Sequence, residues 1–371
     1  MTGRGLPGEP LGERFRQFRA RLEQPNGGGL RRGARRGGSA GPGLVAGEPR
    51  PVPPAGFASY YGRPILKAPV WRHDIPAYLF TGGLAAGTAL LAAGADLTGR
   101  PALRRSGRLV ALGAVAASTY FLINDLGRPA RFHHMLRVAK PTSPMSMGTW
   151  ILAAFGPAAG LAAVSEAAPL LPRHGVSGLA RRLLPVTGRA AGLAAAVTAP
   201  ALATYTGVLL ADTAMPAWHD AHPDLPFLFA GSALVAGAGA GLVAAPVGQA
   251  GPARRLVVAG AVVETLAEHR ISRLGLTGEP YRVGPGGRML RSSRLLLAVG
   301  TAGALLGRRS RVLSVLSGAA LLASSVLTRF GVFEAGVVSA RDPKYTVVPQ
   351  RERLERQAST SAGGPAAAPG G

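Results

Sequence analysis

Long apolar segments alternate with short polar ones along most of the chain. Each segment is rich in Ala, Leu, Val and Gly and has about twenty residues, the length a helix needs to cross the hydrocarbon core of a membrane. Because backbone groups cannot stay unpaired in lipid, these segments should be helices rather than strands. The pattern predicts an all-α membrane protein with eight transmembrane helices, at residues 76–97, 106–126, 147–167, 190–211, 226–247, 254–272, 292–307 and 311–333.

Glycine pairs four residues apart recur within these segments, and such pairs let two helices approach closely. They are Gly83/Gly87, Gly156/Gly160, Gly188/Gly192, Gly237/Gly241 and Gly303/Gly307. The opening of the first segment, 75–82, also resembles that of the fifth, 225–231, and Ala-Gly follows each at 86–87 and 236–237. A repeat this short can arise by chance. If it is real, it predicts two related four-helix bundles, residues 76–211 and 226–333, running in the same direction.

Both ends of the chain differ in composition from this membrane domain, which we place at residues 59–345. Residues 1–58 are rich in Gly, Pro and Arg, and residues 346–371 in Ala, Gly, Ser and Pro, so both tails are predicted to be disordered. The net charge is +24, and the basic residues lie in the tails and between apolar segments, where anionic lipid attracts them. This distribution favours a membrane over nucleic acid as the partner.

The orientation of the chain follows from its basic N-terminal tail. An even number of helices puts both termini on one side, and moving such an Arg-rich tail across a membrane without a signal is costly, so both termini are predicted to be cytoplasmic. Arg and Lys between the helices do not settle the orientation on their own. Arg far outnumbers Lys, which is typical of a GC-rich bacterial genome. We therefore expect a multi-pass protein of the bacterial cytoplasmic (inner) membrane.

The chain has no cysteine, so it can form no disulfide and cannot ligate an iron–sulfur cluster through thiolates. Its seven histidines all fall at the ends of apolar segments or between them, whereas a membrane haem needs paired histidines inside facing helices. We expect no haem, no iron–sulfur cluster and no other metal in this chain. Any electron storage would then belong to another protein.

A polar segment after the second apolar one is unusually specific. Residues 124–138 read NDLGRPARFHHMLRV, and 142–150 read TSPMSMGTW. A basic loop anchored to lipid headgroups would explain the charges alone. The sequence of this segment, however, closely resembles the corresponding loop of the NrfD family, the membrane subunits of polysulfide-reductase-like molybdoenzymes. Looser similarities are Tyr205-Thr206-Gly207, Pro216-Ala217-Trp218, and the stretches 226–234, 78–87 and 339–345, so the resemblance covers roughly residues 60–350.

The resemblance implies an eight-helix subunit that exchanges electrons between a membrane quinone or quinol, menaquinone or ubiquinone, and an iron–sulfur electron-transfer subunit. That partner would in turn serve a molybdopterin catalytic subunit. The lack of cysteine agrees with this division of labour. The partner is expected to dock on the side that carries the 124–150 loop, at Arg131, Arg137 and Lys140.

Quinone chemistry couples electrons to protons, so its site needs hydrogen-bond donors and a titratable group. The candidates are His73 and Asp74 before the first helix, Asp125 and Arg128 in the loop, and Tyr205. The role of Tyr205 is carried over from the family's fourth-helix tyrosine. Each has a plainer alternative: an interfacial anchor for His73 and Asp74, a structural hydrogen bond for Tyr205, and pairing of Asp125 or Arg128 with each other or with Arg131.

Glu264 and Glu268 are four residues apart in the sixth segment and therefore share one helix face. A carboxylate in an apolar helix is a candidate for proton transfer. Alternatively, the helix is short, its end is already hydrated, and Glu268 pairs with Arg270 or Arg273. Arg329, in the last segment, is expected to pair with Glu334 at the membrane surface.

Two other functions remain open from the sequence. A secondary transporter would need broken helices around a polar site at the membrane midplane, and Pro200 offers a single possible break. A purely structural membrane anchor would bind no quinone.

Overall fold

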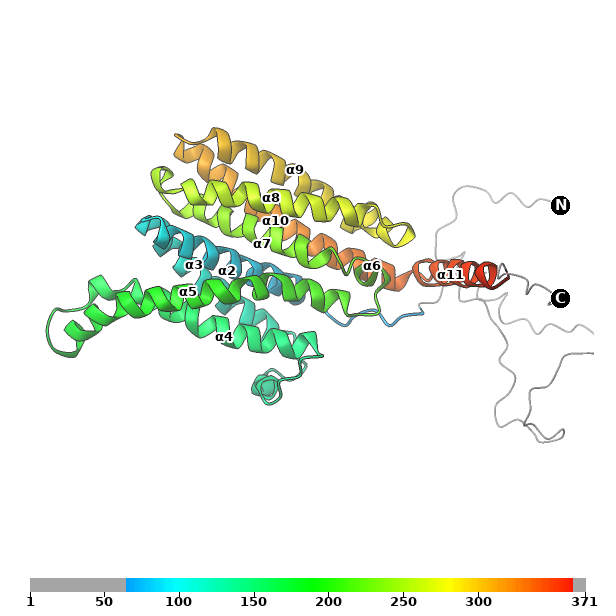
Figure 1. Cartoon of the computed structure of the whole chain (residues 1–371), viewed down its shortest axis with the longest axis horizontal. Coiled ribbons are helices and arrows are strands. Elements are labelled where there is room, and N and C mark those ends of the chain that lie inside the picture. Colours follow the sequence, from blue (N-terminus) through cyan, green and yellow to red (C-terminus); the bar gives the residue numbers. More distant parts are fainter. Residues whose placement is uncertain (1–64, 363–371) are drawn as a thin grey trace, which may run out of the picture. The chain divides into compact units, whose positions relative to one another are not determined.

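A computed structural model describes residues 65–362, and within them all regular structure is helical. The predicted disordered tail 1–58 lies outside these residues. The long helices are α2 (Asp74–Leu97), α3 (Pro101–Asn124), α4 (Pro144–Ser165), α5 (Gly175–Ala211), α7 (Leu225–Ala244), α8 (Gly251–Ser272), α9 (Gly284–Leu306), α10 (Arg311–Arg341) and α11 (Lys344–Ala362) (Figure 1). Short helices join them: η1 (Pro129–Leu136), η2 (Ala168–Leu170), α6 (Pro216–Asp220), η3 (Val247–Gln249) and η4 (Leu276–Tyr281).

All eight predicted membrane helices form, as α2–α5 and α7–α10. In the described part of the chain, seven of them are long and apolar enough to cross a membrane. The eighth, α8, carries Arg254, Arg255, Glu264 and Glu268 and falls outside that group, but it packs along α7 within the bundle. The prediction of an all-α membrane protein is confirmed.

Helical structure extends beyond the predicted apolar segments at several places. α5 begins at Gly175 rather than near 190, and α10 continues to Arg341 rather than ending near 333. Residues 346–362, expected to be disordered, belong to helix α11 instead. Each added stretch contains Arg or Pro, which interrupt an apolar run but do not prevent a helix. The helix α5 also continues through Pro200, so the break that a transporter would need is not there.

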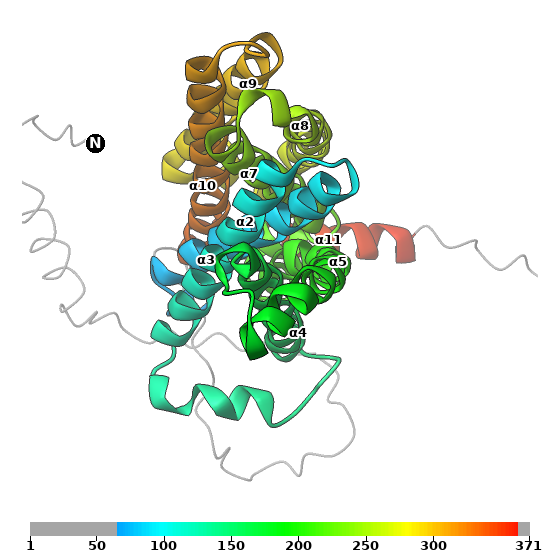
Figure 2. The same cartoon turned by 90° about the vertical axis from the view of Figure 1, so that its left-hand side faces the viewer.

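The helices α2–α5 and α7–α10 lie side by side, and α2 and α7 occupy the middle of the group (Figure 2). Their apolar stretches are each 72% buried, against 28–44% for the other five apolar helices, which explains their near-continuous small and apolar residues. One core joins side chains from both halves of the chain, for example Leu79 and Phe155 with Phe229 and Val332. The division into two four-helix bundles stays a prediction.

The central helices α2 and α7 cross at two glycines. A Cβ atom added to Gly87 would lie 1.9 Å from the backbone oxygen of Ala233, and one added to Gly237 would lie 2.2 Å from the backbone carbon of Gly87. These are the two positions that the Ala-Gly repeat aligns, so the repeated helices meet at equivalent residues. Not every pair works this way: Gly156 and Gly160 have no neighbour within 4 Å.

Candidate functional site

The bundle has two ends that differ in chemistry. We call the η1 end the one where α2 and α4 begin and α3 and α5 finish, beside η1. The η2 end is the opposite one, where α3 and α5 begin beside η2. The predicted quinone and docking residues lie toward the η1 end, and α10 also finishes there. The first membrane helix, α2, therefore begins on the same side of the bundle on which the last one, α10, ends.

Three polar side chains meet where α2 begins and α3 ends. The Asn124 amide donates a hydrogen bond of 3.0 Å to Asp74 Oδ2 in the first turn of α2, and Asp125 caps α3 next to it. Burial and the negative charge of Asp74 raise the pKa of the Asp125 carboxyl, against a lowering by a backbone hydrogen bond and the charge of Arg72. His73 immediately precedes α2. The structure thus places the Asp125 carboxyl close to that of Asp74.

The basic residues after α3 lie on the surface. Arg128 is exposed at the start of η1, a helix without buried residues, and forms no ion pair with Asp125. Arg131, Arg137 and Lys140 are also exposed. The segment is held through its backbone: Val138 O accepts hydrogen bonds from Ser146 Oγ (3.0 Å) and Trp150 Nε1 (3.3 Å) of α4. Among the described residues Asp125 forms no ion pair with Arg128 or Arg131, so the expected pairing is wrong.

Tyr205 lines a separate pocket between α4 and α5. Its ring lies directly over Gly148, where an added Cβ would be 2.2 Å from Tyr205 Cε2, and its side chain is 7% exposed. The Tyr205 hydroxyl is buried and has no hydrogen-bond partner among the described residues. The pocket has a volume of about 320 Å³, and its other lining residues are Pro141, Thr142, Pro144, Met147, Ile151, Ala201, Thr204, Val208 and Asp212. His73, Asp74, Asp125 and Arg128 are not part of this lining.

Glu264 is buried inside the second half of the bundle, with 2% of its surface exposed. Its Oε1 accepts a hydrogen bond of 2.8 Å from Thr328 on α10, whose hydroxyl also lies 2.7 Å from that of Ser293 on α9. Glu264 Oε2 has no partner in the described part of the chain. The alternative of a short helix with a hydrated end is therefore wrong for Glu264. Glu268 pairs with Arg294 Nε at 3.1 Å, and not with Arg270 or Arg273.

Arg329 lies beside this chain of hydroxyls and is fully buried, so the expected surface pair with Glu334 does not form. Its Nη2 donates a hydrogen bond of 2.7 Å to Phe229 O, and its guanidinium stacks 3.9 Å above the Phe229 ring. The same nitrogen would be 2.8 Å from a Cβ added to Gly83, so the charge lies between α2 and α7. Nε and Nη1 have no hydrogen-bond partner among the described residues.

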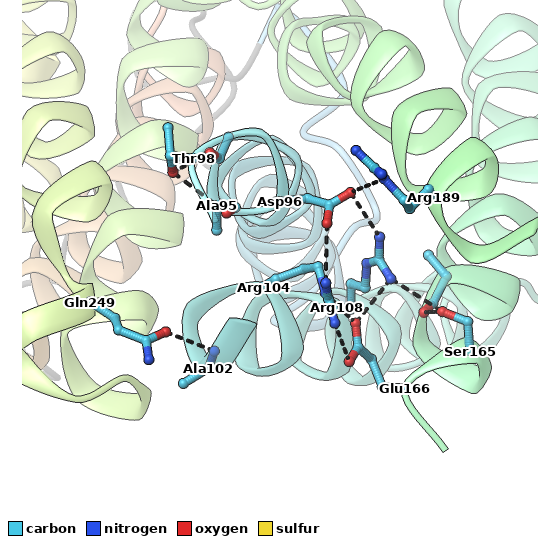
Figure 3. Close-up of polar contacts among 12 residues, drawn as sticks. Ala95, Asp96, Thr98, Ala102, Arg104, Arg108, Ser165, Glu166, Arg189 and Gln249 are labelled. Carbon is cyan, nitrogen blue, oxygen red and sulfur yellow. Dashed lines mark hydrogen bonds and ion pairs between the residues drawn. The ribbon is translucent and has the colours of Figure 1, made fainter. Parts of the chain in front are cut away.

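An ion-pair network that the sequence did not predict lies at the η2 end (Figure 3). Arg104 binds Glu166 through two nitrogens, at 2.8 and 3.2 Å, and Asp96 Oδ1 at 3.1 Å. Arg108 reaches Glu166 Oε1 at 2.9 Å and Ser165 at 3.2 Å, and Arg189 lies 3.2 Å from Asp96. The signal was the position of Asp96 and Glu166 at the ends of two apolar segments, among several arginines.

The residues from 65 to 357 contain no group of three or more His, Asp or Glu side chains that could hold a metal ion. The Tyr205 hydroxyl is a buried donor without a hydrogen-bond partner among the described residues, and its residue lines a mostly apolar pocket. A model of the family described as "Polysulphide reductase, NrfD" matches residues 65–259, just over half of the chain. A search of curated proteins found no match.

Proposed function

Because the chain belongs to the NrfD polysulphide reductase family, we propose that it is the quinone-reactive membrane subunit of a redox complex. It exchanges electrons between a membrane quinone or quinol and an iron–sulfur partner that serves a molybdopterin oxidoreductase. The observation that carries this proposal is the Tyr205 pocket, where a buried phenol without a partner adjoins an apolar cavity. The chain is a multi-pass membrane protein. We propose that it lies in the bacterial inner membrane with both termini in the cytoplasm.

The Tyr205 hydroxyl is suited to hold a quinone carbonyl. A buried donor without a partner costs about 1–3 kcal/mol, which a ligand oxygen would recover. Met147, Ile151 and Val208 supply the apolar surface on which a quinone ring can lie. The volume of about 320 Å³ lies at the low end of the range for small-molecule sites, enough for a head group while its tail remains in lipid.

Oxidation of a quinol releases two electrons and two protons, and reduction of a quinone takes them up. The electrons pass to the iron–sulfur partner, since the chain has no cysteine to bind a cluster. The protons are exchanged by His73, Asp74 and Asp125 at the same end of the bundle, while Arg128 supplies a permanent positive charge that can bind a quinone oxygen. The raised pKa of Asp125 supports this role, because a carboxyl with a higher pKa takes up a proton closer to neutral pH.

Glu264 and Glu268 form a second proton-transfer group in this proposal. Glu264 contacts Thr328, which contacts Ser293, so polar atoms continue from α8 to α10 and α9 inside an apolar bundle. Glu268 lies one turn closer to the η1 end, and its pairing with Arg294 is half-exposed. A carboxylate kept inside membrane helices is expensive, and a proton relay is the function that justifies it.

The experiment starts from the complex purified out of native membranes in mild detergent. Co-eluting chains are identified, and quinone reduction and quinol oxidation are assayed for the wild type and for Tyr205→Phe. The matched control is Tyr120→Phe, because Tyr120 is 63% exposed on α3 and lies outside the pocket. We expect an iron–sulfur protein and a molybdoenzyme to co-elute, and Tyr205→Phe alone to raise KM for quinone by about tenfold.

Two outcomes would contradict the proposal in different ways. If the partners co-elute but Tyr205→Phe matches Tyr120→Phe, the chain is a membrane anchor and the pocket is not the quinone site. If the chain elutes alone and a quinone photoprobe does not label it, the redox function itself is excluded.

A further inference from the structure

A basic pocket of about 280 Å³ lies at the η2 end, between the start of α3, the end of α4, η2 and the beginning of α5. Four arginines line it, and Glu166 is the one carboxylate among its lining residues. The arginines are Arg104, Arg108, Arg181 and Arg189, and the remaining lining residues are Ser165, Ala168, Pro169 and Pro185. Figure 3 shows three of these arginines converging on Glu166 and Asp96.

The pocket carries more positive charge than its carboxylates balance. Asp96 and Glu166 together face Arg104, Arg108 and Arg189, which leaves one positive charge in excess. Arg181 adds a second, because it donates hydrogen bonds only to the backbone oxygens of Pro169 (2.6 Å) and Leu171 (3.1 Å). An excess of buried or half-buried arginine is stabilised by an anion.

Arg108 provides independent evidence for a missing partner. Its side chain is 5% exposed, and its Nε has no hydrogen-bond partner among the described residues although two carboxylates lie nearby. A buried guanidinium donor left unpaired is costly, since it has given up water without a replacement. The chemical group that fits several arginines at once is a phosphate, which offers several acceptor oxygens to planar guanidinium groups.

The beginning of α5 places this pocket at the membrane surface. Gly188 contacts Ser165, the last residue of α4, so α5 residues 175–187 extend past the end of that helix. This extension exposes apolar side chains at helical spacing, namely Val176 (87%), Leu179 (59%), Leu183 (52%) and Val186 (69%). A helix that combines such a face with arginines is typical of the boundary between headgroups and acyl chains.

We propose that the η2-end pocket binds the phosphate of an anionic phospholipid, of the phosphatidylglycerol class. Arg181 and Arg189 bind the phosphate oxygens from the rim, and Arg108 stabilises the charge from within. The acyl chains lie along the exposed apolar face of α5. This adjoining face is the reason that a lipid fits better than free phosphate, which would use the arginines and leave the apolar side chains in water.

The test uses the purified full chain, with any subunits that accompany it, in nanodiscs containing a photoactivatable phosphatidylglycerol. Crosslinked peptides are mapped by mass spectrometry while the fraction of probe is varied. The variant is Arg181→Gln with Arg189→Gln, and the matched control is Arg182→Gln, an exposed neighbour on α5 outside the pocket lining. We expect crosslinks within residues 168–189 for the wild type and the control. The variant should need about tenfold or more probe for half-maximal labelling, because each arginine contributes about 1 kcal/mol to binding of an anionic lipid.

Three results would overturn the proposal: equal labelling of variant and control, equal labelling by a phosphatidylcholine probe, or loss of labelling when millimolar inorganic phosphate is added. The last would assign the pocket to a free anion. If the double variant does not fold, as judged by its thermal unfolding, Arg189→Gln alone serves, because Arg189 is 64% exposed at the rim; it should weaken labelling about fivefold. Unchanged labelling in that variant would equally contradict the proposal.

Discussion

The ring of Tyr205 occupies space that only a glycine leaves open. A Cβ atom on Gly148 would lie within 3.0 Å of three ring atoms, so Gly148→Ala must displace the ring and reshape the pocket beside it. We expect this variant to lower quinone-dependent activity by about tenfold, mainly through a higher KM for quinone, because the hydroxyl no longer stands where the carbonyl binds. The measurement is steady-state kinetics of the complex with varied quinone.

The control for this prediction lies two turns further along the same helix. Gly156 has no neighbour within 4 Å, so Gly156→Ala adds a methyl group to open space and slightly favours the helix. Its kinetics should match the wild type. If both alanine variants behave alike, the packing of the Tyr205 ring on Gly148 does not control quinone binding.

The position of Arg329 could not be predicted from the sequence. The apolar pattern ends near residue 333, so an arginine four residues earlier reads as interfacial. In the structure α10 continues to Arg341, which places Arg329 three turns inside the helix, and Phe229 supplies both a backbone oxygen and a ring for it. The partner comes from a helix a hundred residues away, and no local pattern reveals such a contact.

Arg329 on α10 and Glu264 on α8 are buried groups of opposite charge, so their contributions to stability should be coupled. The Thr328 hydroxyl contacts Glu264, and Arg329 is the next residue on α10. We expect Arg329→Met and Glu264→Gln to be destabilising singly, and the double variant to be less destabilised than their sum by about 0.5–3 kcal/mol, because neither charge is then left alone. The free energies of unfolding of the wild type, the two single variants and the double variant in mixed micelles measure this coupling. Strict additivity would show that the two charges do not interact.

At the scale of helices, the sequence predicted what depends on local patterning. All eight membrane helices were located from apolar length, because a membrane helix must be apolar over about twenty residues. The start of α5 was missed because Arg181, Arg182 and Arg189 interrupt its apolar character, although arginine is a good helix former. Which helices pack together depends on shape across the bundle, and the glycine pairs predicted this only partly.

The crossing of α2 and α7 makes a sharp prediction. Gly87→Ala would place a methyl group against the backbone of Ala233 and Gly237, where no side chain can move away. Because the two helices must separate, we expect a loss of stability of about 1–3 kcal/mol and a lower thermal unfolding temperature. Both halves of the core meet at this crossing, so the loss should reach the whole bundle.

The matched control is Gly94→Ala, on the same helix but with no neighbour within 4 Å. It tests the effect of alanine in α2 without the crossing, and should leave the unfolding temperature unchanged or slightly higher. A stable Gly87→Ala protein would mean that α2 and α7 do not approach each other as closely as their glycines allow.

At the scale of the whole molecule, basic residues serve differently at the two ends. At the η2 end they converge on Asp96 and Glu166, whereas the basic residues of the η1 segment point outward without ion pairs among the described residues. The sequence could single out the η1 segment because its charges are adjacent in the chain. The η2 network combines residues from separate helices, and only the fold brings them together.

This asymmetry supports docking at Arg131, Arg137 and Lys140. Surface charges that already had partners would gain little from a second protein, but these three side chains are exposed and free. Exposed ion pairs contribute about 0.2–1 kcal/mol each, so changing all three to glutamine should weaken binding of the iron–sulfur partner by about tenfold. The loss should be largest at low salt, because screening already weakens these contacts in the wild type at high salt.

Binding of the partner to the variant is measured by its retention on the immobilised membrane subunit across a salt series. The control replaces three exposed arginines at the opposite end, Arg105, Arg173 and Arg182, with glutamine, which changes the net charge equally. If attraction depended only on net charge, both triple variants would lose the partner to the same extent. Loss confined to the η1 variant places the partner at that end, next to the Tyr205 pocket, where electrons have the shortest distance to travel.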